Sequence, residues 1–180
     1  NAQGLKASVT DSNSKTTSYV YDAFGDLLTT TDSSGDVVTL AYDIRGNKTD
    51  STDPDMGHWT YGYDVLKELK SQVDAKSQTT SLSYDLLGRV TERSESGMVS
   101  DWLYDGATHG VGMLQKTCTS SSSNSSCSST TITKKTFTYD ATGRPSTTTI
   151  NVASTDHVTT TTYNTTNGAV DTVAYPSGLT

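Results

Sequence analysis

The sequence predicts an all-β protein, a continuous antiparallel meander of hairpins that forms one curved sheet. Three observations predict this class. Thr and Ser supply 34 and 25 of the 180 residues, against only three Glu, and this composition favours strands over helices. A Tyr-Asp pair recurs at a nearly constant spacing. Apolar and polar residues alternate before each pair, as they do in a strand with one covered face.

Seven copies of the Tyr-Asp pair divide the chain into repeated units, the last of them degenerate. Successive tyrosines are 21, 21, 21 and 20 residues apart, and the spacing then widens to 35 and 24. The pairs are Tyr21-Asp22, Tyr42-Asp43, Tyr63-Asp64, Tyr84-Asp85, Tyr104-Asp105, Tyr139-Asp140 and Tyr163-Asn164. A fixed period of this length is typical of a repeat protein. We therefore expect one repeat region over residues 1–180, without an internal domain boundary.

The first strand of each unit is predicted to end at its Tyr-Asp pair. In the second unit this strand is Val37–Asp43, in which Leu40 and Tyr42 share one face, and we expect that face to be buried. A return strand follows at residues 48–52. Tight turns join only antiparallel neighbours, so chained units predict a meander of about fourteen strands.

Turn residues follow each first strand at a fixed distance. Four residues after the tyrosine stand glycines, which adopt positive φ without strain: Gly25, Gly46, Gly88 and Gly143. We expect the Asp of each pair to accept hydrogen bonds from backbone amides of the turn that it begins. Asp32, Asp53 and Asp74, eleven residues after their tyrosines, are expected to open the second turns.

Three stretches depart from the repeat. Lys67 replaces the glycine of the third unit, which predicts either another turn type or a strained non-glycine residue. The fifth unit has a longer glycine-rich loop at residues 105–112. A Ser-rich insertion at residues 119–131 is interpreted as a solvated excursion from a hairpin. Cys118 and Cys127 could close as a disulfide in an oxidising compartment, although their spacing alone does not establish the bond.

Charge and motif content disfavour several function classes. The net charge of −7 and the scattered basic residues argue against nucleic acid as a partner. No apolar run approaches the roughly 20 residues of a membrane-spanning helix. We expect no catalytic site, cofactor or metal, because neither a phosphate-binding loop nor a nucleophile elbow is present. The three histidines, which lie in separate units, are His58, His109 and His157.

Two alternative roles for the repeated residues remain open. The Asp50, Asp53 and Asp55 cluster could bind a cation, although single Asp residues 21 apart do not form a calcium loop and a turn role is simpler. Aromatic residues on first strands could instead form a sugar-binding stripe. Packing is the simpler explanation, because Leu fills the same positions in sister units. These aromatic residues are Trp59, Tyr61, Tyr63, Trp102 and Tyr104.

Two segments carry a more specific pattern of Tyr-Asp, two residues, then Gly-Arg. They are Tyr84-Asp85-Leu86-Leu87-Gly88-Arg89 and Tyr139-Asp140-Ala141-Thr142-Gly143-Arg144. With these motifs, residues 16–180 resemble the YD-repeat, or Rhs, family. The resemblance implies large proteins whose repeats wind as a spiral β-sheet into a hollow shell. In bacterial Rhs and insecticidal toxin-complex proteins the shell encloses a toxic C-terminal segment, and related barrels occur in teneurins.

The resemblance implies a structural function for this chain. We expect part of the β wall of a secreted or cell-surface bacterial protein that encapsulates a toxin or effector polypeptide. The expected partners are the remaining repeats of the same parent chain and the enclosed polypeptide, with surface glycans as a further candidate and no membrane insertion. The family's self-cleaving core and a toxin domain have no match here, so the chain is interpreted as a fragment. The alternative function is a cell-surface adhesion or carbohydrate-binding module.

Overall fold

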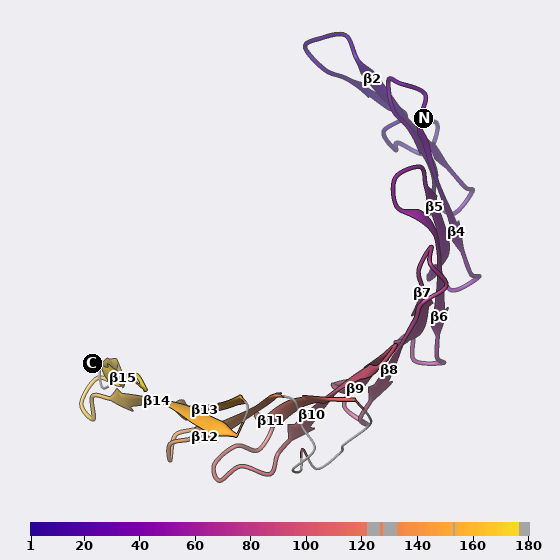
Figure 1. The fold of residues 1–180 in the computed structure, drawn as a ribbon. Helices are drawn as coiled ribbons and strands as arrows, with labels where there is room; N and C mark the ends of the chain where they lie inside the picture. The colour runs from indigo at the N-terminus through magenta and orange to yellow at the C-terminus, as the bar shows by residue number, and fades with distance from the viewer. Residues whose placement is uncertain (122–126, 128–132, 153, 177–180) are drawn as a thin grey trace. The chain divides into compact units, whose positions relative to one another are not determined.

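The computed structural model describes residues 1–121, 127, 133–152 and 154–176 (Figure 1). Every regular element in these residues is a β-strand, and none of them forms a helix that could cross a membrane. The strands are β1 Ser8–Thr10, β2 Thr16–Tyr21, β3 Leu27–Thr31, β4 Val37–Tyr42, β5 Lys48–Asp53, β6 Gly57–Tyr63, β7 Leu69–Val73, β8 Thr79–Tyr84, β9 Val90–Glu95, β10 Met98–Tyr104, β11 Leu114–Ser120, β12 Thr133–Tyr139, β13 Pro145–Val152, β14 Thr155–Tyr163 and β15 Val170–Ala174.

The strands form one antiparallel sheet in which spatial order follows chain order. This confirms the predicted meander, with fifteen strands in the described residues against the expected fourteen. The additional strand is β1, which precedes the first tyrosine and pairs with β2. The sheet is not closed, because in the described part of the chain β1 pairs only with β2 and β15 only with β14.

Two compact units divide the chain, Asn1–Ser81 and Leu82–Thr180, and each is described by itself. The first contains β1 to β7, and the second contains β9 to β15. In both units the ladder shifts register at the tyrosine that ends a first strand, for example between Ala41 and Tyr42 and between Leu103 and Tyr104. A bulge at this position lets the chain enter a tight turn while the strand pairing continues.

Neither unit encloses a large apolar core, because each is a single layer of sheet. Among the described residues, only Val99 and the two cysteines are buried hydrophobic residues. The expectation that the tyrosine face is buried is therefore wrong in degree. Leu40 and Tyr42 alternate with exposed neighbours, as predicted, but both remain half-buried. Domains normally bury a sheet face against a second layer, and in the part of the chain that the structure describes no second layer covers these strands.

Five of the described turns after Tyr-Asp, those that begin at Asp22, Asp43, Asp64, Asp85 and Asp140, share one local geometry. In the second unit the Gly46 amide donates to the Asp43 carbonyl oxygen at 3.0 Å, and Gly46 has φ 78°. The Asp43 Oδ1 atom accepts the amides of Arg45 and Asn47 at 2.8 and 2.9 Å. This is a type I turn followed by a left-handed residue, a common three-residue hairpin loop. The aspartate thus organises the turn that it begins.

Lys67 resolves the alternatives that the sequence leaves open for the third unit. The turn type is retained, because the Lys67 amide donates to the Asp64 carbonyl oxygen at 3.2 Å as glycine does elsewhere. Lys67 itself adopts φ 69°. A lysine therefore occupies a backbone conformation that side chains with a Cβ rarely adopt.

The two cysteines are joined in a disulfide, Cys118–Cys127, with a Cα–Cα distance of 5.5 Å. Cys118 lies in β11, and both half-cystines are buried. Most of the predicted Ser-rich excursion, at 122–126 and 128–131, lies outside the described residues.

Candidate functional site

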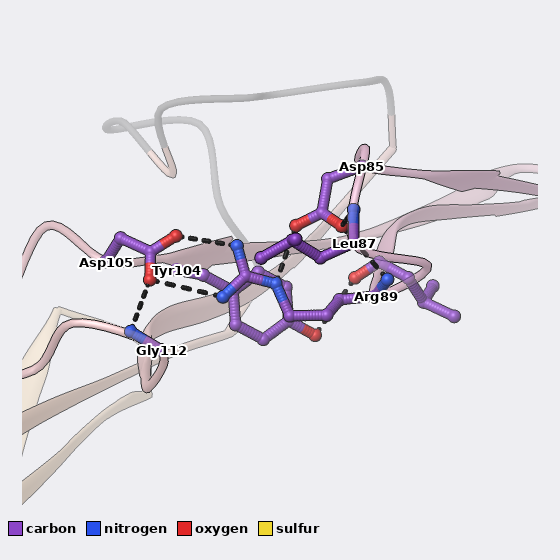
Figure 2. Close-up of polar contacts among 7 residues, drawn as sticks. Asp85, Leu87, Arg89, Tyr104, Asp105 and Gly112 are labelled. Atoms are coloured by element: carbon purple, nitrogen blue, oxygen red, sulfur yellow. Dashed lines mark hydrogen bonds and ion pairs between the residues drawn. The ribbon is translucent and has the colours of Figure 1, made fainter.

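A cluster of charged and aromatic side chains joins the Tyr-Asp turn after β8 to the next Tyr-Asp pair, at the end of β10 (Figure 2). The cluster begins with Asp85, whose Oδ1 atom accepts the amides of Leu87 and Arg89 at 2.9 and 3.0 Å. The Arg89 Nε atom donates to Asp85 Oδ2 at 2.6 Å. One carboxylate therefore shapes the turn with one oxygen and fixes the direction of the arginine with the other.

The Arg89 guanidinium spans from its own turn to the next hairpin. Its two terminal nitrogens donate to the Asp105 carboxylate at 3.2 and 2.6 Å. Its central carbon lies 4.3 Å from the centroid of the Tyr104 ring. A planar guanidinium can satisfy a carboxylate with two bonds and stack on an aromatic face at the same time, which lysine cannot do. Figure 2 shows this stacked arrangement.

Tyrosine and aspartate of the second hairpin complete the cluster. The Tyr104 hydroxyl donates to the Val90 carbonyl oxygen at 3.0 Å. Asp105 Oδ1 also accepts the Gly112 amide at 2.6 Å, which ties down the longer loop at residues 105–112. We call this set of contacts, in which Arg follows one Tyr-Asp turn and stacks on the next tyrosine, the Tyr-Asp-Arg clamp.

The clamp recurs at the other Gly-Arg motif of the chain. Arg144 donates through Nε to Asp140 Oδ2 at 2.8 Å and through Nη1 to the Gly168 carbonyl oxygen at 3.1 Å. Its guanidinium carbon lies 4.1 Å from the centroid of the Tyr163 ring. The Tyr163 hydroxyl donates to the Pro145 carbonyl oxygen at 2.8 Å, one residue after the arginine, as Tyr104 does at Val90. The Gly-Arg signature is therefore a connector between hairpins.

Other units connect their turns through different side chains. Arg45, inside its turn, donates to the carbonyl oxygens of Asp64 and Val65 in the next turn. Lys67 returns a hydrogen bond from Nζ to the Arg45 carbonyl oxygen at 2.6 Å. Gln3 reaches the Asp22 carbonyl oxygen at 2.9 Å. Side chains therefore also join the turns that begin at Asp43 and Asp64, without a stacked arginine.

Hydrogen bonding controls the ionisation of the clamp carboxylates. Bonds from the Arg89 side chain, and then from the Gly112 amide, hold the pKa of Asp105 below its ordinary value. The backbone amide of Arg144 is the largest influence on Asp140, whose pKa is also lowered. The clamp therefore favours ionised carboxylates. Burial raises the pKa of Tyr63 and Tyr139, so these tyrosines are held in their neutral form.

The candidate histidine and carboxylate side chains of β5 and β6 take part in local contacts. No group of three or more His, Cys, Asp or Glu side chains within the described residues is arranged to hold a metal ion. His58 Nε2 lies 2.6 Å from Asp50 Oδ2 on an exposed part of β5 and β6. Asp53 uses its carboxylate to accept the amides of Asp55 and Met56. The Asp50, Asp53 and Asp55 cluster is thus divided between a histidine pair and a turn.

The aromatic residues weighed as a sugar-binding stripe are half-buried and take part in local packing. The Trp59 indole donates to the Met56 carbonyl oxygen at 3.1 Å. Lys48 Nζ lies 4.4 Å from the centroid of the Tyr61 ring. Trp102 lines an open groove of about 450 Å³ beside Arg89 and Tyr104. The sequence motifs identify Tyr104 and Arg89 as repeat residues. Their stacking could not be predicted from the sequence, because they lie fifteen positions apart on different hairpins.

The sequence also matches a described protein family. The family model named RHS Repeat matches residues 1–37, 21–55 and 63–97, which together cover half of the chain. This chain belongs to the RHS repeat family. The matched segments contain the first four Tyr-Asp turns. The resemblance read from the Tyr-Asp motifs is therefore confirmed. No curated protein matches the chain in sequence.

Several solved structures that are similar to this fold are of Tc toxin proteins. A mutant Tc holotoxin pore from Photorhabdus luminescens has a TM-score of 0.53 at 17% identity, over 87% of this chain. TcdB2-TccC3 without its hypervariable C-terminal region gives 0.51 at 19% identity over 87%, and TcdB2-TccC3-Cdc42 gives 0.50 at 18% over 87%. The match spans about a tenth (10%) of each of those chains. At these identities the likeness shows the fold alone.

Proposed function

We propose that this chain is a segment of a structural β wall in a secreted bacterial Rhs or toxin-complex protein, and that the wall encloses a toxin or effector polypeptide. The observation that carries the proposal is a single-layer meander in which the Tyr-Asp-Arg clamp joins neighbouring hairpins at two places. The clamp of Arg89 holds a Tyr-Asp turn against the next hairpin through side chains rather than through a shared core. Such a sheet can extend by adding units while staying one layer thick.

The comparisons support a shell-like structural role, and the enclosed polypeptide is the finer part of the proposal. One neighbour is described as TcdB2-TccC3 without a hypervariable C-terminal region. By analogy, the partners of this chain are further repeats of its parent and a C-terminal polypeptide inside the wall. The Cys118–Cys127 disulfide fits a secreted or cell-surface location, because such bonds persist in oxidising compartments.

A structural role also implies that the chain acts without catalysis, cofactor or metal. The His58–Asp50 pair is the one histidine–carboxylate contact in the part of the chain that the structure describes. The His58 side chain is 57% exposed, whereas acid–base catalysis in a site relies on groups that converge on a substrate. We therefore assign this pair to cross-strand stabilisation between β5 and β6.

Protease protection in the parent protein tests enclosure. The parent is expressed with its C-terminal segment, and the rate of digestion of that segment is measured in the assembled protein and as an isolated polypeptide. Enclosure predicts much slower digestion in the assembled protein. The double variant Arg89→Ala, Arg144→Ala is expected to shorten this protection, because both stacked clamps are lost.

The matched control is Arg93→Ala, which removes an arginine paired with Glu95 away from the clamp. It is expected to leave protection unchanged. Equal digestion of the C-terminal segment in the assembled and isolated forms would refute enclosure.

A carbohydrate-binding or adhesion module is the second candidate, and the open groove beside Trp102 and Tyr104 favours it. Aromatic rings in an open groove can stack on sugar rings. A glycan array on the intact parent, repeated with Trp102→Ala and Trp59→Ala, distinguishes the two functions. Selective loss of glycan binding in the Trp102 variant would support adhesion.

A further inference from the structure

A second open pocket lies between the first two Tyr-Asp turns, within residues 1–81. Its volume is about 500 Å³, and its apolar lining includes Phe24, Leu28, Tyr42 and Ile44. Phe24 and Ile44 sit at the tips of their turns with 93% and 104% exposure. Large apolar side chains that are this exposed on neighbouring turns are typical of an interaction surface.

The groove at Arg89 provides an internal template for this pocket, because several equivalent repeat positions line both. Tyr42 corresponds to Tyr104, the tyrosine that ends the second hairpin. Asp22 corresponds to Asp85, the first residue after the preceding tyrosine. The two sites differ at the fifth residue after that tyrosine, which is Arg89 in one and Asp26 in the other.

At Asp26 the pocket has a carboxylate where the groove at Arg89 has a guanidinium stacked on a tyrosine. The pairing of Thr29 with Thr39 places Asp26 across from Tyr42, the position from which Arg89 stacks on its own tyrosine. Among the described residues, none donates a hydrogen bond or forms an ion pair with the Asp26 carboxylate. The pocket therefore contains the Tyr42 ring, but no guanidinium of the pocket lining stacks on it.

The electrostatic character of the pocket is complementary to a cation. Three carboxylates line it, those of Asp22, Asp26 and Asp43, and no Lys or Arg does. Burial raises the pKa of Tyr42, and the charges of Asp26 and Asp22 raise it further. An apolar pocket with a tyrosine ring and a carboxylate rim suits an organic cation with an apolar stem. A metal ion is a poorer fit, because these carboxylates are not among any described group arranged to hold one.

We propose that this pocket binds an arginine side chain from a separate polypeptide. The guanidinium would stack on Tyr42 and pair with Asp22 and Asp43, which correspond to the Asp85 and Asp105 partners of Arg89, and Asp26 would add a third carboxylate. The aliphatic stem would lie against Phe24 and Ile44. The inference does not depend on enclosure, because it concerns only the chemistry of one pocket.

Ligand-observed NMR on the parent protein tests the proposal with N-acetyl-arginine amide as the probe. Saturation transfer is measured against N-acetyl-citrulline amide, which has the same shape without charge, and N-acetyl-lysine amide. Arginine is expected to bind about ten-fold more tightly than citrulline and several-fold more tightly than lysine.

Variants at the pocket decide whether the binding occurs there. Asp26→Arg introduces the residue that two other units carry at this position, Arg89 and Arg144, so the turn accommodates it. The new side chain is expected to fill the pocket and to weaken probe binding at least ten-fold. Asp26→Asn keeps the shape and is expected to weaken binding a few-fold. The control Asp36→Arg makes the same charge change on a turn outside the pocket and is expected to leave binding unchanged.

Three results would overturn the proposal. The first is equal binding of the arginine and citrulline probes. The second is binding that survives Asp26→Arg. The third is self-association of the parent that Asp26→Arg abolishes while the arginine probe does not bind, which would assign the pocket to a second copy of the chain.

Discussion

Substituting Gly46 by alanine isolates the backbone requirement of the Tyr-Asp turn. Gly46 has φ 78°, and a Cβ atom built there meets no other atom within 4 Å. The substitution therefore adds no steric clash and removes no side-chain contact. Its whole effect comes from placing a residue with a Cβ in the left-handed region.

The expected cost is about 1 kcal/mol in the local opening of the β4–β5 hairpin. A left-handed conformation costs a residue with a Cβ about 1–2 kcal/mol, and the smaller conformational freedom of alanine in the open state offsets up to about 1 kcal/mol of this. A change of about 1 kcal/mol corresponds to roughly a five-fold increase in amide exchange from the locally open state.

Lys67→Gly is the inverse experiment in the next unit. It relieves a non-glycine residue at φ 69°, which should stabilise the turn by about 1 kcal/mol. It also removes the hydrogen bond from Lys67 Nζ to the Arg45 carbonyl oxygen, a contribution of about 0.5 kcal/mol. The net gain of about 0.5 kcal/mol predicts roughly two-fold slower exchange in the β6–β7 hairpin.

Native-state hydrogen exchange with mass spectrometry on the parent protein measures both effects. Peptides from residues 37–53 report on Gly46→Ala, and peptides from residues 57–73 report on Lys67→Gly. Peptides from β13 and β14 serve as the internal reference and should not change. Unchanged exchange in the Gly46 variant, or faster exchange in the Lys67 variant, would refute the assignment of a shared left-handed turn position.

Other consequences of the clamp and the single layer can be measured directly. Tyr104→Phe keeps the ring but removes the hydroxyl that donates to Val90, so urea denaturation followed at this hairpin should show a loss of about 1 kcal/mol, and no loss would contradict the hydrogen bond. Reduction of Cys118–Cys127 should destabilise residues 82–180 by about 2–3 kcal/mol in the chain-entropy estimate, measured by denaturation with and without dithiothreitol, and equal midpoints would count against it. Because the pKa of Asp140 is lower in the folded state, its stabilisation is complete above the ordinary carboxyl pKa and is lost as pH falls below about 4; urea midpoints that stay constant from pH 6 to pH 2 would contradict this. The isolated 180 residues, with two open sheet edges, should self-associate in light scattering, and a concentration-independent, cooperatively unfolding monomer would argue against this expectation.

The strands and turns were predictable because their causes are local. Alternation identifies the face that Leu40 and Tyr42 share, and Gly46 marks the left-handed turn residue. The Asp43 bonds involve amides only two and four residues away. The degree of burial was overestimated, because alternation shows which face is apolar and does not show whether a second layer covers it.

The candidate site was only partly predictable for the opposite reason. Arg89 and Asp105 lie sixteen residues apart, on different hairpins, and no local signal pairs them. The vacant counterpart at Asp26 could be recognised only after the Arg89 clamp had shown what occupies that position. A sequence comparison of the units places Asp26 and Arg89 at the same position, but it does not show that a tyrosine ring lies opposite.

The sequence by itself determined the repeat, the strand direction and the turn chemistry, since each depends on residues within a few positions of one another. The tertiary structure decided which side chains cross from one hairpin to the next, including the stacking of Arg89 on Tyr104 and the open pocket at Tyr42. Those contacts depend on strand register and on bulges at the tyrosines, which place residues about twenty positions apart within bonding distance.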